Sequence, residues 1–208
     1  MESRDRRHRS GLIAAGLLCA ASIASAAPER YVIDPAHTYP GFAIGHLGIS
    51  QLRGRFNKTT GWIELDRQAK AGRLDVTIDV TSLDTGLAPR DRNLLQGTFG
   101  AALFDAERFP EMHYRADRMV YDGDVPVAID GELTLLGVTR PVMLVVRGFQ
   151  CAFNPLRLAQ GCGAQATARL KRSEFGMLGL ESWIADEVDL VIDVEAYPET
   201  LPTAGRAR

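Results

Sequence analysis

The side chains best suited to acid–base or metal chemistry in this sequence are its histidines. Of the four, His8 lies in an N-terminal segment that we expect to be removed, and His37, His46 and His113 remain. No pair has the i, i+4 spacing that places two zinc ligands on one face of a helix. No Gly-x-Ser-x-Gly nucleophile motif and no dense group of carboxylates accompanies them. The sequence therefore predicts no enzyme, no metal site and no resident cofactor.

Two of the three cysteines are placed to form a disulfide. Cys19 lies in the N-terminal segment, whereas Cys151 and Cys162 are eleven positions apart in the body of the chain, with no Cys-x-x-Cys motif and no histidine nearby. In an exported protein such a pair predicts one disulfide that closes a short loop. A metal pair and a redox dithiol are the alternatives.

The first 26 residues have the pattern of an export signal. Residues 1–10 carry four arginines, and residues 11–26 carry no charge. The apolar stretch 11–21 is shorter than the roughly 20 residues that cross a bilayer, and Ala24-Ser25-Ala26 is an A-x-A cleavage signal. We expect cleavage after Ala26 and a periplasmic protein, with a short membrane anchor as the alternative. Residues 27–200 then form one domain, and 201–208 a disordered tail.

Composition limits the class of protein and of partner. The 208 residues are 46% hydrophobic and 24% charged, with a formal charge of −2. These values are typical of a packed globular domain rather than a disordered chain or a polytopic membrane protein. A weakly acidic chain lacks the positive surface that binds phosphate backbones, so nucleic acid is not an expected partner.

Alternation of apolar and polar residues with a period of two dominates the body of the chain. It is clearest at residues 73–81, where Leu74, Val76 and Ile78 share a face, and at residues 187–196. Weaker versions predict six more strands, at 39–47, 54–66, 111–121, 127–136, 142–149 and 163–171, with a hairpin turn at 137–141. Helix signals are scarce. Pro89 is placed to begin a short helix that ends before Gly97.

Eight mostly antiparallel strands predict an all-β protein, and closure into an up-and-down barrel removes exposed sheet edges. A two-sheet sandwich fits the same period. Ala164, Ala166 and Ala168 share one face of their strand. An eight-stranded barrel is either filled by side chains or holds one small ligand. Small residues facing inward would leave an apolar space, unless they face a packed helix instead.

Short motifs in a characteristic order run through nearly all of residues 30–197. They are Tyr31-Val-Ile-Asp-Pro-Ala-His37, Phe42-Ala-Ile-Gly-His46-Leu-Gly48, Gly54-Arg-Phe56, Ser82-Leu-Asp-Thr-Gly86, Arg90-Asp91, Phe104-Asp105, Phe109-Pro110, Gly131-Glu-Leu-Thr134, Gly137-Val-Thr-Arg-Pro141 and Arg172-Ser-Glu-Phe-Gly-Met177. In these motifs the chain resembles the YceI-like family. The resemblance implies an eight-stranded antiparallel lipocalin-like barrel with one or two short helices. It also implies an apolar tunnel for a polyisoprenoid chain, with a quinone or phosphate head near one end.

The resemblance and the alternation together suggest site residues. The expected tunnel lining is Phe42, Ile44, Phe104, Ala166, Ala168, Phe175 and Met177. His37, His46, Arg90 and Arg172 are the candidates for the head group, because an arginine at a tunnel entrance can bind a phosphate or a quinone carbonyl. The alternative is structural: histidines that hydrogen-bond within the scaffold, and an arginine–aspartate pair that holds a helix to the barrel.

The expected function is non-enzymatic binding or transport of an isoprenoid lipid, either a polyprenyl phosphate or an isoprenoid quinone, in the periplasm. Two alternatives remain open: an enzyme or quinone-linked redox accessory that acts on such a lipid, and a stress-induced envelope protein with a packed barrel. Expected partners are the lipid and, transiently, a membrane or membrane protein. The protein itself is expected to be a monomer or a homodimer.

Overall fold

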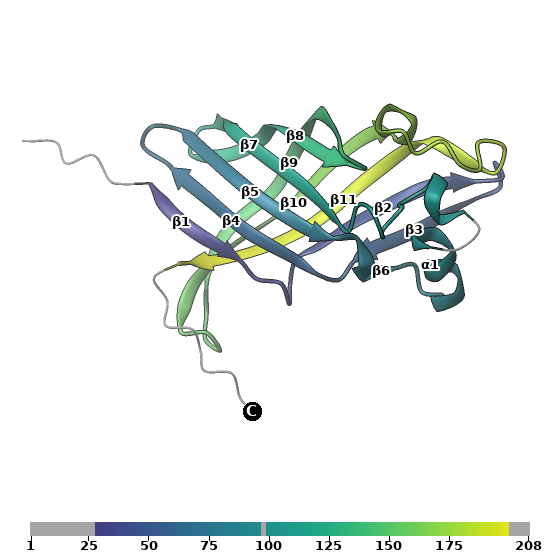
Figure 1. Ribbon diagram of the computed structural model, residues 1–208. Coiled ribbons are helices and arrows are strands. Elements are labelled where there is room, and N and C mark those ends of the chain that lie inside the picture. The colour runs from purple at the N-terminus through teal and green to yellow at the C-terminus, as the bar shows by residue number, and fades with distance from the viewer. Residues whose placement is uncertain (1–27, 97–98, 200–208) are drawn as a thin grey trace, which may run out of the picture.

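The computed structural model describes residues 28–96 and 99–199, which form one closed β-structure (Figure 1). The predicted signal segment, 1–26, and the predicted tail, 201–208, lie outside the described residues. The strands are β1 Glu29–Ile33, β2 Tyr39–His46, β3 Ser50–Phe56, β4 Thr59–Asp66, β5 Ala71–Asp79, β6 Leu83–Asp84, β7 Glu111–Asp122, β8 Val125–Leu135, β9 Val138–Asn154, β10 Ala159–Lys171 and β11 Ile184–Pro198. Within this part of the chain no helix is both long and apolar enough to cross a membrane.

Eight of these strands close into an antiparallel barrel. The order around the ring is β1-β4-β5-β7-β8-β9-β10-β11, and β1 pairs with β11 to complete it. Closure satisfies the backbone hydrogen bonds of every strand in the ring, and it excludes the two-sheet sandwich. The predicted eight-stranded barrel is therefore confirmed.

Three strands of the ring are interrupted and continue as a second strand: β1 is followed along the chain by β2, β4 is preceded by β3, and β5 is followed by β6. β2 continues β1 along the same edge of β11, β3 pairs with β2, and β6 pairs with β3. The break between β1 and β2 contains Pro35, which has no N–H for the ladder, and a turn in which Ala36 N donates to the Asp34 side chain at 3.2 Å. We call the end of the barrel reached by β2 and β3 the cap end, and the opposite end the hairpin end.

Short helices cover the cap end. α1, Ala88–Leu95, has Pro89 in its first turn, as predicted, and is followed by the 3₁₀ turn η2, Gly100–Ala102. The turn η1, Val80–Ser82, joins β5 to β6, and η3, Arg172–Phe175, follows β10. Gly179 N donates to Ala102 O at 3.0 Å, so the segments around η2 and η3 are tied together.

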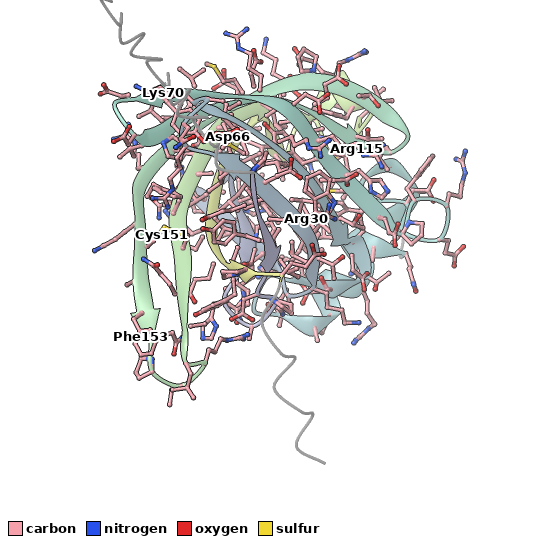
Figure 2. All side chains as sticks on the ribbon, turned by 90° about the vertical axis from the view of Figure 1, so that its left-hand side faces the viewer. Arg30, Asp66, Lys70, Arg115, Cys151 and Phe153 are labelled. Carbon is pink, nitrogen blue, oxygen red and sulfur yellow. A yellow bond between two sulfur atoms is a disulfide. The ribbon has the colours of Figure 1, made fainter. Side chains whose placement is uncertain are left out.

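The β9–β10 hairpin projects beyond the barrel at the hairpin end, at the lower left of Figure 1. Its disulfide joins Cys151 to Cys162, which face each other in the strand register. Figure 2 looks onto this end, with Phe153 near the tip of the projecting hairpin. The predicted disulfide is therefore present, and it ties together two strands that already pair.

Candidate ligand cavity

A cavity of about 220 Å³ occupies the barrel interior and extends to the cap end. All eight ring strands contribute lining side chains, and Leu94, Phe104 and Leu180 close the space from the cap. The lining is apolar apart from Thr38, Thr59, Tyr114 and Arg172. An engineered cavity of about 150 Å³ is large enough to hold benzene. The space here therefore exceeds a packing defect and suits an apolar ligand.

The alternation of β11 shows why the interior is hollow. Val188 and Ala196 face inward and are buried, whereas Leu190, Ile192 and Val194 also line the interior but keep exposed surface. Their exposed surface faces the cavity, because side chains opposite do not reach across to cover it. The inner face of β11 is thus incompletely covered along its middle.

A second cavity of about 70 Å³ lies toward the hairpin end. Both cavities are lined by Ile63, Ile129, Ala166 and Val194, so these four side chains form a neck between the two spaces. Ala166 is the smallest of them. The two cavities therefore follow one another along the barrel, separated by this neck.

The predicted lining residues divide into two groups. Phe42, Ile44, Phe104, Ala166 and Met177 line the larger cavity. Phe175 and Ala168 lie outside the lining of both cavities: the phenyl ring of Phe175 is 1% exposed within the core of the cap, and Ala168 packs against the core.

Arg172 lies at the cap end, where it lines the cavity and is 3% exposed. Its Nε donates to Ala185 O at 3.0 Å, its Nη1 donates to Met177 O and Gly179 O at 2.7 Å each, and its Nη2 donates to Ile184 O at 3.4 Å. Burial lowers the pKa of the guanidinium from its ordinary value, although Asp186 and Glu181 oppose this effect. Arg172 therefore shapes the segment between η3 and β11 that closes the barrel.

Arg90 has a local role in the structure. Its Nε donates to Thr85 Oγ1 at 2.7 Å and its Nη2 to Thr85 O at 2.5 Å, while Asp91 accepts hydrogen bonds from the backbone N–H and the hydroxyl of Thr85. These contacts fix the turn that leads into α1, and Arg90 lines neither cavity.

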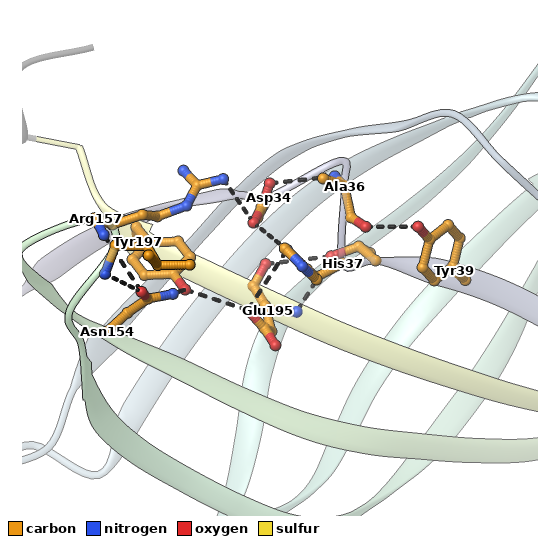
Figure 3. A network of polar contacts seen from close by, with 10 residues as sticks. Asp34, Ala36, His37, Tyr39, Asn154, Arg157, Glu195 and Tyr197 are labelled. Carbon is orange, nitrogen blue, oxygen red and sulfur yellow. Dashed lines mark hydrogen bonds and ion pairs between the residues drawn. The ribbon is translucent and has the colours of Figure 1, made fainter. Parts of the chain in front are cut away.

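His37 lies on the outside of the barrel, with its side chain 55% exposed. Its Nδ1 donates to Asp34 Oδ2 at 2.7 Å, and Arg157 Nη2 forms an ion pair with the same oxygen at 2.8 Å (Figure 3). Burial favours a higher pKa for Asp34, but the hydrogen bonds from His37 and Ala36 and the charge of Arg157 outweigh it, so this pKa is lowered. The hydrogen bond to Asp34 raises the pKa of His37.

The same network reaches the projecting hairpin. Arg157 lies over the ring of Tyr197 at 4.6 Å, and Asn154 donates to the Tyr197 hydroxyl at 2.8 Å (Figure 3). The Tyr197 hydroxyl in turn donates to Glu195 Oε2 at 3.2 Å. The network therefore holds the β9–β10 turn against β11 and the β1–β2 break.

Three side chains of this network could contact a cation. One ligand atom each from Asp34, His37 and Glu195 lies within 4.8 Å of the others. However, Arg157 and His37 both bond to one oxygen of Asp34, and Arg157 supplies its counter-charge. We interpret the group as a hydrogen-bond network. His46, at the end of β2, lines neither cavity.

With the geometry described, comparison with known proteins identifies the family. The family model of the YceI-like domain matches residues 31–196. The chain belongs to the YceI-like family. A UPF0312 protein of Photorhabdus laumondii is 34% identical over 190 residues, which cover 91% of this chain and 96% of that protein.

Solved structures share the YceI-like barrel. BcnA of Burkholderia cenocepacia has a TM-score of 0.63 and 23% identity, covering 78% of this chain and 98% of that one. A polyisoprenoid binding domain from Saccharophagus degradans has a TM-score of 0.60 and 16% identity, covering 81% and 98%. At these identities the likeness establishes the fold.

The sequence reasoning missed three polar residues of this YceI-like cavity: Thr38, Thr59 and Tyr114. Ile63 and Leu65 face inward on β4, and the same alternation places Thr59 inward. The signal was obscured because residues 54–66 were predicted as one strand. Phe56, an even-numbered position, also faces inward, since the break at Asn57 and Lys58 shifts the alternation by one.

Proposed function

We propose that this YceI-like protein is a non-enzymatic carrier of an isoprenoid lipid, and that it works in the periplasm. The observation that carries the proposal is the apolar cavity of about 220 Å³ inside a closed barrel. Burying hydrocarbon there removes it from water, which stabilises the complex by roughly 0.8 kcal/mol per CH₂. Because the barrel is already formed, little of this gain is lost to ordering the protein.

The related folds support the choice of ligand. The Saccharophagus degradans domain that shares this barrel is a polyisoprenoid binding domain. A long hydrocarbon chain with short methyl branches is suited to two apolar cavities that follow one another along the barrel. The export pattern of residues 1–26 supports a periplasmic site of action.

A carrier explains the polar lining better than an enzyme does. The titratable side chains lining the larger cavity are Tyr114 and Arg172. The Tyr114 hydroxyl donates to Val142 O at 2.8 Å, and Arg172 donates to backbone carbonyls. Both groups thus serve the scaffold, whereas acid–base catalysis needs a group that can reach a substrate proton. The cavity also argues against a packed barrel.

Purification of the protein from its native envelope, followed by native mass spectrometry and lipid extraction, tests the proposal. We expect one isoprenoid lipid per protein and a mature chain that begins at Ala27. Recovery without any bound lipid, together with no uptake of added prenyl lipids, would contradict the carrier function. Recovery of the mature chain from another compartment would contradict the periplasmic location alone.

A further inference from the structure

Exposed apolar side chains gather on the outer surface of the cap end. Leu47 and Ile49, in the turn between β2 and β3, are 53% and 83% exposed. Leu178 and Trp183, in the segment between η3 and β11, are each 55% exposed. Leu47 N donates to Trp183 O at 2.7 Å, so the turn and the segment lie side by side, at the right of Figure 1. We call these four side chains the apolar rim.

The apolar rim adjoins the part of the wall that closes the larger cavity. Leu180 and Ile184 line that cavity, and Trp183 lies between them in the sequence. Leu52 of β3, three residues after Ile49, lines it as well. The same two stretches of chain therefore present apolar side chains both to the ligand space and to the outside. A lipid that enters or leaves at the cap end must pass beside the rim.

Folding alone does not account for these exposed side chains. Leu47 has a φ of 53°, a left-handed conformation that is costly for a bulky residue and that Asn, Asp or Gly adopt more readily. Its side chain gains little burial in return, because about half of it is exposed. Single exposed apolar residues are ordinary, but several gathered beside a ligand cavity indicate a binding surface.

The size and charge of the rim favour a lipid bilayer as its partner. A stable protein interface buries about 800 Å² on each partner, contributed by roughly 20–30 residues, which is far more than four side chains provide. Partition into lipid requires no complementary surface, and tryptophan with aliphatic residues is typical of the membrane interface. Residues 47–50 carry no charge and residues 176–183 carry one, Glu181. The rim thus offers apolar area without an excess of positive charge.

We propose that the apolar rim docks on the surface of a lipid bilayer, with Ile49 and Trp183 inserted at the boundary between head groups and acyl chains. The inference rests on the proposed carrier function and deepens it, since it names the face through which the carrier exchanges its lipid. Docking depends on apolar area, so anionic lipid is not required for it.

The tip of the projecting hairpin supplies a matched control at the opposite end of the barrel. Phe153 and Leu156 are 64% and 94% exposed, at least as much as Trp183, and neither lines either cavity. A double variant at the tip removes comparable apolar area. It therefore separates the position of the rim from exposure in general.

The test measures flotation of the mature protein with vesicles of phosphatidylcholine alone and of phosphatidylethanolamine with phosphatidylglycerol. We expect the double variant Ile49→Ser and Trp183→Ser to bind both kinds of vesicle at least about tenfold more weakly than the wild type. The double variant Phe153→Ser and Leu156→Ser should bind as the wild type does. Both double variants should keep the wild-type affinity for a prenyl alcohol measured without vesicles, and its melting temperature.

Fluorescence locates the contact. The sequence contains two tryptophans, so Trp62→Phe leaves Trp183 as the sole reporter. On addition of vesicles its emission should shift to shorter wavelength, and lipids with brominated acyl chains should quench it. Trp62→Phe keeps an aromatic ring beside Arg30, which lies 4.2 Å from the Trp62 ring centre.

The outcomes separate docking from the carrier function. Absence of vesicle binding, an unshifted Trp183 emission with bound vesicles, or an equal loss in the two double variants would overturn docking by the rim. Binding that requires phosphatidylglycerol or that high salt abolishes would overturn its apolar basis. In each case the affinity for the prenyl alcohol would leave the carrier in place, whereas failure to bind that alcohol would remove both proposals.

Discussion

Arg172 shows how one buried side chain can organise an end of the barrel. Its guanidinium bridges Met177, Gly179, Ile184 and Ala185 by hydrogen bonds to their carbonyls. Replacement by Met fills similar space but leaves those acceptors without their donor. We expect Arg172→Met to lower the free energy of unfolding by about 3 kcal/mol or more, measured by urea denaturation.

Arg169, three residues earlier on β10, provides the matched control. Its side chain is 63% exposed and pairs with Asp189 at 2.6 Å and with Glu187 at 3.7 Å. Exposed ion pairs contribute little, so Arg169→Met should cost less than about 1 kcal/mol. Equal costs at the two positions would mean that the carbonyl contacts of Arg172 do not hold the cap.

Ala166 governs the passage between the two cavities because it lines both. A leucine there would occupy the neck and part of the space available to a ligand. We expect Ala166→Leu to weaken lipid binding at least about tenfold while leaving the melting temperature unchanged or higher, because the added methyl groups enter an empty apolar space. Titration with a prenyl lipid and a thermal melt measure the two effects.

The outward-facing neighbour of Ala166 controls for the change in side-chain size. Thr167→Leu alters the outer wall of the barrel and should leave lipid affinity unchanged. If Ala166→Leu also binds lipid as well as the wild type, the ligand does not occupy the neck.

The His37–Asp34 hydrogen bond gives the fold a small pH dependence of known sign. The folded pKa of His37 lies above its ordinary value of 6.5, so its contribution is fully present below that pH and is lost as pH rises through the raised value. Asp34 has a lowered pKa, and its contribution is lost only in acid, below its ordinary value of 3.8. The two effects therefore fall in separate pH ranges.

A comparison of melting temperatures across neutral pH checks this dependence. The wild type should be more stable than His37→Gln at pH 6, and the difference should shrink toward pH 9. Because the ring is mostly exposed, we expect a change of about 2 °C or less. A difference in melting temperature that stays constant with pH would show that the hydrogen bond to Asp34 does not raise the pKa of His37.

How far a sequence predicts a site depends on whether local alternation or tertiary packing decides it. The alternation of residues along the strand predicted that Phe42 and Ile44 share the inner face, and both line the cavity. It could not separate Ala166 from Ala168, which share a face of β10 but differ in what lies opposite. His37 and Arg90 are governed by turns at Asp34 and Thr85 whose direction the sequence pattern does not specify.

At the scale of elements, alternation located the strands, and the turns decided their ends. The hairpin turn expected at 137–141 is shorter: β8 ends at Leu135 and β9 begins at Val138. Leu136 and Gly137 both have positive φ, 54° and 74°, as in the two-residue turn that fits the twist of paired strands. β1 was not predicted as a strand because its five residues are too few to show alternation clearly.

The disulfide of the projecting hairpin joins strands that already pair, so removing it measures what the covalent bond alone contributes to stability. In the chain-entropy model a loop of this size stabilises the fold by about 3 kcal/mol. Cys151 and Cys162 also face each other in the register of β9 and β10, so backbone pairing supports the same contact. We expect the double variant Cys151→Ser and Cys162→Ser to melt up to about 12 °C lower while its lipid affinity is retained. Thermal melts and lipid titration measure these effects.

Reductant provides the control for the disulfide. It should lower the melting temperature of the wild type toward that of the double variant, and it should leave the double variant unchanged. Loss of lipid binding in the double variant would show that the disulfide shapes the smaller cavity, which Cys162 lines together with Phe149 and Ala164 of the same two strands.

At the scale of the whole molecule, the closed wall of the barrel is what allows the interior to stay partly empty. β11 pairs with β10 on one side and with both β1 and β2 on the other, so the wall is held by backbone hydrogen bonds along its length. The interior can stay partly empty because the ladder fixes the wall independently of interior packing. The sequence pattern predicted the ring, but the volume left inside depends on how side chains from eight strands meet, which no local pattern contains.

A tunnel of fixed length predicts a definite dependence of affinity on chain length. Each added isoprene unit should tighten binding while it enters the two cavities of about 220 and 70 Å³, because each buried CH₂ contributes roughly 0.8 kcal/mol. Once the tunnel is full, further units stay in water and affinity should level off. Titration with prenyl alcohols of increasing length measures this plateau. In Ala166→Leu the plateau should come at a shorter chain, because the neck no longer admits the tail. Affinity that rises without limit, or that ignores chain length, would place the ligand on the surface of the barrel instead of inside it.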